Sequence, residues 1–170
     1  MRKTCCLLVA IAAAAAADEP LAARVNGVAV PVARFERYFS EWLEASGKKP
    51  GAIRTPAVYK RFRREALAEL LDEELLWQEA TRARVVATQD QVDHAVARIK
   101  AGFPSREAYL RRLGRGGFTE ATYAEHVGRE LSIELWIERQ FGAGEAARDK
   151  LQEKLHALRS AASIEVLAPF

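Results

Sequence analysis

Cysteine is almost missing from this 170-residue sequence, and the two that occur, Cys5 and Cys6, lie near its N-terminus. From residue 7 onward the chain can form no disulfide, no thiolate metal site and no thiol nucleophile. Enzyme classes that depend on cysteine chemistry are therefore excluded for that part of the chain. The same part can fold in an oxidising compartment, because it holds no thiol that could be oxidised.

Long hydrophobic runs are also scarce. One uncharged run, Cys5–Ala17, covers 13 residues, too few for a transmembrane helix of roughly 20 residues. Arg2 and Lys3 precede this run and small alanines close it, which is the pattern of a secretory signal peptide. We predict a signal peptide over residues 1–17, cleaved near Ala17, and a domain over residues 18–170 that is periplasmic or otherwise exported. An uncleaved N-terminal anchor stays open as an alternative, and no later segment predicts stable membrane insertion.

The sequence has little net charge and few candidate catalytic groups. Without Arg2 and Lys3, 24 basic residues remain against 23 acidic ones, so nothing predicts a nucleic-acid partner. His94, His126 and His156 lie on three separate predicted helices, and none has a histidine or cysteine at helical spacing to share a metal ion. Phosphate-binding, nucleophile-elbow and dinucleotide glycine motifs are missing as well. We expect no metal, no cofactor and solvent-exposed histidines.

Local signals predict a mostly α-helical fold, a bundle of about six helices with a small β element. Asn26-Gly27 lies between two valine-bearing arms, which is typical of a hairpin turn, and residues 163–167 alternate like a half-buried strand. We expect this C-terminal strand to join the N-terminal hairpin. Helices are predicted around residues 35–43, from Pro56 to about residue 83, after caps at Thr88, Ser105 and Thr119, and around residues 151–158.

The predicted helix that follows Thr119 has an unusual acidic stripe. Glu130, Glu134 and Glu138 repeat every four residues, and such stacked carboxylates repel one another unless they are solvated or matched by cations. We expect the stripe to face water or a basic neighbour, with Arg61 or Arg64 as candidate partners. Apolar residues flank the stripe on both sides. A flank left uncovered on a soluble protein marks a binding site.

Five short segments together resemble the N-terminal chaperone domain of the SurA/PrsA/PpiD family of exported folding factors. They are residues 25–30 (VNGVAV), 66–80 (ALAELLDEELLWQEA), 86–93 (VATQDQVD), 117–123 (GFTEATY) and 158–166 (LRSAASIEV). In that family a parvulin-type prolyl isomerase domain commonly lies between the helix that corresponds to the one after Thr119 and the closing helix. Here residues 141–145 (FGAGE) lead directly into the last helix. The resemblance therefore implies a chaperone domain without isomerase activity, and we expect no enzyme.

The function predicted on this basis is ATP-independent binding of unfolded or outer-membrane client polypeptides in an apolar groove. The candidate peptide-binding residues are Ile133, Trp136, Ile137, Trp77, Trp42 and Phe39. A second hypothesis is an accessory or assembly protein that binds one fixed partner, or forms a homodimer, through the same surface. A third, a working peptidyl-prolyl isomerase, is disfavoured by the missing domain.

Overall fold

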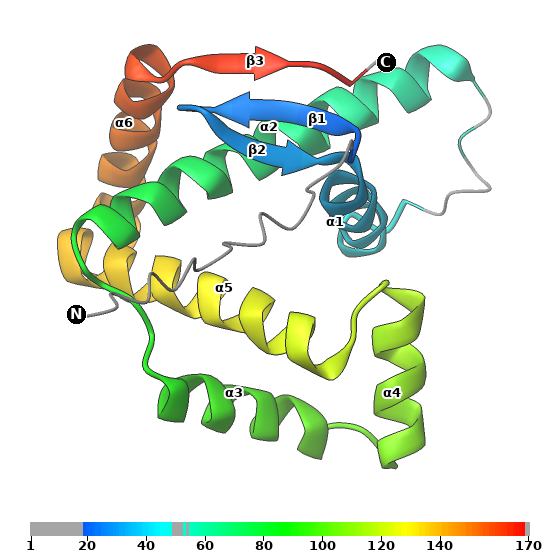
Figure 1. The fold of residues 1–170 in the computed structure, drawn as a ribbon. Coiled ribbons are helices and arrows are strands. Elements are labelled where there is room, and N and C mark those ends of the chain that lie inside the picture. The colour runs from blue at the N-terminus through cyan, green and yellow to red at the C-terminus, as the bar shows by residue number, and fades with distance from the viewer. Residues whose placement is uncertain (1–18, 49–52, 54, 169–170) are drawn as a thin grey trace, which may run out of the picture.

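The computed structural model describes residues 19–48, 53 and 55–168, so the predicted signal peptide lies outside the described residues. Along this part of the chain the elements are β1 (Leu21–Val25), β2 (Val28–Pro31), α1 (Val32–Ala45), α2 (Pro56–Arg82), α3 (Gln89–Ala101), α4 (Arg106–Arg115), α5 (Glu120–Phe141), α6 (Glu145–Ala161) and β3 (Ile164–Val166). The prediction of six helices with a small β element is confirmed (Figure 1). None of the described helices is long and apolar enough to cross a lipid bilayer.

The three strands form one antiparallel sheet in the order β2-β1-β3. Asn26 and Gly27 have φ angles of 52° and 82°, the positive values that a two-residue type I′ hairpin turn requires. Asn26 also holds the C-terminal strand, because its backbone N–H donates to the Ser163 carbonyl at 2.8 Å and its side-chain oxygen accepts from the Ser163 N–H at 3.0 Å. The predicted joining of the hairpin and the C-terminal strand is thus confirmed, and one turn residue links them.

The helix starts follow the predicted caps with one exception. The Thr88 and Thr119 side chains accept from backbone N–H groups three residues later, in capping boxes, and Ser105 caps α4 in the same way. Thr55 occupies the N-cap position of α2, but its side chain makes no capping hydrogen bond. Pro56 at the first helical position starts α2 instead, because its fixed φ suits a helix and it has no N–H to satisfy.

Helix α2 is the spine of the molecule and buries side chains on two sides. Its first half packs with α1 and the sheet in a core that includes Phe35, Phe39 and Leu70. Its second half packs with α5 and α6 in a second core, formed by Leu76, Ala80, Ile133, Trp136 and Leu155. Figure 1 shows α3 and α4 on the side of α5 that faces away from the sheet. Between the two cores, α1 and α5 approach α2 from different sides, and this arrangement positions the site.

Candidate binding cleft

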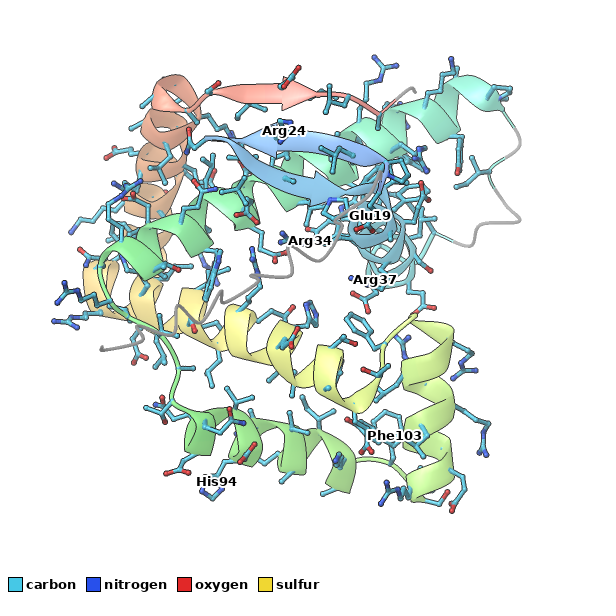
Figure 2. All side chains as sticks on the ribbon, in the orientation of Figure 1. Glu19, Arg24, Arg34, Arg37, His94 and Phe103 are labelled. Carbon is cyan, nitrogen blue, oxygen red and sulfur yellow. The ribbon has the colours of Figure 1, made fainter. Side chains whose placement is uncertain are left out.

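A cleft of about 210 Å³ opens between α1, α2 and α5. Its floor contains Leu70, which is 1% exposed, and its walls combine aromatic with charged side chains. The aromatic and basic residues of its lining include Arg34, Arg37, Tyr38, Phe118, His126 and Arg129. Figure 2 shows Arg34 and Arg37 leaving α1 on the side that faces α5.

Glu74 on α2 is the buried anchor of this region. Its side chain is 1% exposed, and its Oε2 accepts from Arg34 Nη1 at 2.6 Å and from Arg129 Nη2 at 2.7 Å. Burial alone raises the pKa of Glu74, but the hydrogen bonds and charges of the two arginines outweigh it and bring the pKa below its ordinary value. The carboxylate therefore stays ionised at neutral pH, and it ties α1 and α5 to the spine.

The same carboxylate is connected to the sheet. Gln78, one turn further along α2, donates from Nε2 to Glu74 Oε1 at 3.1 Å and lies at 3.1 Å from the Val25 carbonyl. Its Oε1 accepts from Asn26 Nδ2 at 2.8 Å. A continuous polar network thus runs from the hairpin turn through Gln78 and Glu74 to Arg34 and Arg129, which line the cleft.

Aromatic rings and cations alternate along the cleft wall. The Arg37 guanidinium lies 5.0 Å from the centroid of the Phe118 ring, and Phe118 stacks on His126 at 5.2 Å. Outside the cleft lining, the Arg129 guanidinium also lies 4.8 Å from the centroid of the Trp77 ring, at the edge of the second core. Such cation–aromatic pairs present apolar area together with charge, so the wall can contact both apolar and polar groups of a ligand.

Two ionisable groups of α5 have pKa values shifted toward their neutral forms. Burial, together with the charges of Glu73 and Glu134, raises the pKa of Glu130 to about 7. Burial lowers the pKa of His126, and its Nε2 lies 3.3 Å from Glu130 Oε1. Around pH 7 this pair thus carries less charge than an ordinary ion pair. Among the described residues no group of three or more histidine, cysteine, aspartate or glutamate side chains is placed to hold a metal ion.

Comparison with known protein families shows which family the chain belongs to. The family described as SurA-like N-terminal domain matches residues 7–136, which is more than half of the sequence. The chain belongs to this family. No curated protein matches it. The match starts within the predicted signal peptide and ends within α5, so α6 and β3 lie beyond it.

Membership has general functional consequences. SurA-like N-terminal domains are the non-catalytic, chaperone part of a periplasmic family, and domains of this kind bind polypeptide clients. In this SurA-like domain residues 142–144 alone separate α5 from α6. The resemblance that the sequence motifs indicated is confirmed.

The six residues predicted to bind peptides do not line the cleft. Ile133 and Trp136 are 7% and 3% exposed, because α2 and α6 cover this flank of α5. Trp77 and Ile137 are half-buried at the edge of the same core, whereas Phe39 and Trp42 pack in the first core, near Phe62. The structure does not bring the six together on one open face, and their role in peptide binding stays a prediction.

Two smaller expectations are wrong. Arg61 contacts Glu65 on its own helix, and Arg64 reaches the Lys60 carbonyl, so neither arginine matches the acidic stripe of α5. His126 is not solvent-exposed like His94 and His156, because it stacks on Phe118 with only 24% of its side chain exposed.

The residues that build the cleft were missed because the sequence does not reveal their contacts. Arg34 lies 40 positions before Glu74, and Arg129 lies 55 positions after it. One signal was present. Glu74 falls within an otherwise leucine-rich sector of α2, between Leu71 and Leu75, where a carboxylate requires a partner.

Proposed function

We propose that this domain holds unfolded exported polypeptides, without ATP, in the cleft between α1 and α5. One observation carries the proposal: an open cleft has an apolar floor at Leu70 and aromatic walls at Tyr38 and Phe118, and arginines and carboxylates line the same walls. Apolar client side chains would rest mainly against the half-buried aromatic walls at Tyr38 and Phe118. The surrounding charges would keep the complex hydrated and soluble.

The mixed character of the cleft fits loose, sequence-tolerant binding. An unfolded segment loses chain entropy when it is ordered, so a shallow cleft of this size supports weak binding to each segment. Arg37 can stack on an aromatic client side chain or pair with an acidic one without moving far from Phe118. Weak and adaptable contacts are what a holding chaperone needs, because it must release its clients.

The six peptide-binding residues predicted from the sequence are not the first contact site in this proposal. A client could reach Ile133 or Trp136 only if α6 moved away from α5, since α6 supplies Leu151 and Leu155 to that core. Binding in the cleft requires no such movement. We therefore assign first contact with clients to the cleft.

The test is suppression of aggregation by a variant with a filled cleft. Glu125 is exposed and lines the cleft, so Glu125→Trp should occupy the space that a client needs. Glu138→Trp is the matched control, because Glu138 is exposed on the same helix. Light scattering is followed after a denatured outer-membrane protein is diluted into buffer that contains each purified variant without ATP.

We expect the unmodified domain and Glu138→Trp to reduce scattering, and Glu125→Trp to reduce it much less. If scattering is unchanged by an excess of the unmodified domain, the holding function is wrong. If both tryptophan variants act as well as the unmodified domain, clients bind elsewhere on the molecule.

Export of the domain is part of the proposal. The predicted signal peptide, residues 1–17, lies outside the described residues. Mass determination of the protein recovered from a periplasmic fraction would test its removal. A chain that begins at residue 18 supports cleavage, and an intact chain in the membrane fraction supports the anchor.

A further inference from the structure

The outer edge of β3 pairs with no other strand among the residues that the structure describes. Ile164, Val166 and Leu167 are 37%, 49% and 43% exposed, although aliphatic side chains of this size are usually covered. Natural edge strands are commonly blocked by lysine, proline or a bulge. At the opposite edge of the sheet, the β1–β2 pairing contains a register shift and β2 ends at Pro31. The strand β3 has no proline and no register shift; it is three residues long and carries one charged side chain, Glu165.

Hydrogen bonding shows which backbone groups of β3 point outward. The Asn26 N–H donates to the Ser163 carbonyl, the Leu167 N–H donates to the Ala22 carbonyl, and Glu165 is opposite Arg24 in the same register. In an antiparallel pair, alternate residues direct both backbone polar groups to the partner strand. The N–H and C=O groups of Ile164 and Val166 must therefore point away from β1.

These outward groups have no other partner in the part of the chain that the structure describes. No hydrogen bond outside the sheet ladder reaches the backbone of Ile164 or Val166 there. The side chain of Glu165 is exposed and makes no ion pair with any described residue. An added strand would thus meet two donors and two acceptors that have no described partner, the Glu165 carboxylate on one face of the sheet, and the Ile164 and Val166 side chains on the other face.

We propose that the edge of β3 binds an extended client segment as a fourth, antiparallel strand, with lysine or arginine opposite Glu165 and apolar residues on both sides of it. Backbone hydrogen bonds to Ile164 and Val166 supply the attachment, and the alternating side chains supply the preference. This inference rests on the proposed binding of unfolded polypeptides and names the class of segment that is bound.

Charge argues for a peptide and against a second copy of the chain at this edge. Two β3 strands related by a two-fold axis through Glu165 would place the two carboxylates directly opposite each other. Like charges in that position destabilise a sheet, whereas opposite charges stabilise it. A segment with the pattern apolar–basic–apolar satisfies every exposed group of β3.

The first experiment uses the unmodified domain and a short fluorescein-labelled peptide in which valine stands on each side of a central lysine. Binding is measured by fluorescence anisotropy. A second peptide is identical except that the amides of the two valines are N-methylated, which removes the donors that would face β3. A third carries glutamate in place of the lysine. We expect N-methylation to abolish measurable binding and glutamate to weaken it roughly two- to fivefold.

Two variants test the site itself. Val166→Pro removes an N–H that points outward, so it should block strand addition while the β1–β3 ladder remains. Circular dichroism and the melting temperature check that this variant is folded. Glu165→Lys should reverse the preference, so that the glutamate peptide binds more tightly than the lysine peptide by a similar factor.

Equal binding of the methylated and unmethylated peptides overturns the inference, and so does a dimer that light scattering detects in the unmodified domain but not in Val166→Pro. If the unmodified domain suppresses aggregation but binds no peptide of this pattern, only the edge-strand inference fails. If it binds the lysine peptide as expected but leaves aggregation unchanged, the holding function fails and the strand site stands.

Discussion

Replacing Glu74 by glutamine tests the polar network at the base of the cleft most directly. The substitution keeps the size of the side chain but removes its charge, and it leaves Arg34 and Arg129 without their shared carboxylate. Breaking a buried ion pair from one side costs roughly 3–5 kcal/mol. Here we expect about 3 kcal/mol, at the lower end of that range, because the two arginines keep 21% and 25% of their side chains exposed and Arg34 still contacts Glu73 at 3.3 Å.

Urea unfolding followed by circular dichroism at pH 7 measures this loss, which should also lower the melting temperature by about 6–12 °C. Glu65→Gln is the matched control on the same helix. Glu65 contacts Arg61 at 3.5 Å with 45% of its side chain exposed, so its loss should cost at most about 0.5 kcal/mol. Equal losses for the two variants would refute the assigned role of Glu74.

The pH dependence gives an independent check of the same reasoning. The folded pKa of Glu74 is lowered from an ordinary value of 4.5. Its stabilising contribution is therefore present above that ordinary value and is lost as the pH falls through the lowered one. The stability difference between the unmodified domain and Glu74→Gln should narrow in acid, where the carboxyl group becomes neutral like the amide. A difference that stays constant down to acidic pH would contradict the ionic basis of the network.

Three further predictions concern the core, the turn and the stripe. Trp136→Ala should cost about 3–5 kcal/mol in urea unfolding, because the ring is 3% exposed, and a loss below about 1 kcal/mol would contradict the second core. Asn26→Ala should lower the free energy of unfolding by about 2 kcal/mol, because alanine disfavours a φ of 52° and cannot make the side-chain hydrogen bonds to Gln78 and Ser163. Asn26→Gly should lower it less, because glycine tolerates the positive φ. The reverse order of the two melting temperatures would contradict this. Glu130 has a pKa raised to about 7, so the stability linked to its neutral form is full below pH 4.5 and is lost as the pH rises through 7. The melting temperature of Glu130→Gln should therefore rise relative to that of the unmodified domain between pH 5 and pH 8, by no more than about 2–4 °C because half of the side chain is exposed; a difference that does not change with pH would contradict this.

The elements that could be predicted from the sequence are those that short-range chemistry determines. Asn26-Gly27 specifies its turn by itself, since few other pairs tolerate two positive φ angles. Thr88 and Thr119 each specify a helix start through hydrogen bonds with the residue three positions later. These signals require no knowledge of distant parts of the chain, and the order of elements followed from them.

The flank of α5 could not be assigned in the same way, because its environment is tertiary. Ile133 and Trp136 have the same helical spacing whether the flank is open or covered. The last helix carries the relevant information, because its apolar stripe, which includes Leu151 and Leu155, also has to be buried against a neighbour. Two unmatched apolar stripes on consecutive helices, joined by only residues 142–144, satisfy each other by packing together. Comparing stripes between neighbouring helices would have predicted the second core.

The cleft was hidden for a related reason, and the cause also explains why it stays open. Apolar side chains on α1, α2 and α5 would draw the three helices together until no space remained, because close packing is favourable at every contact. Arg34, Glu74 and Arg129 instead fix the helices through hydrogen bonds of 2.6 and 2.7 Å, whose geometry sets a separation. The long arginine side chains span the distance between helices, and 21% and 25% of their side-chain surface stays exposed. A polar network can therefore hold a hollow of about 210 Å³ in a small domain where an apolar contact would have closed it.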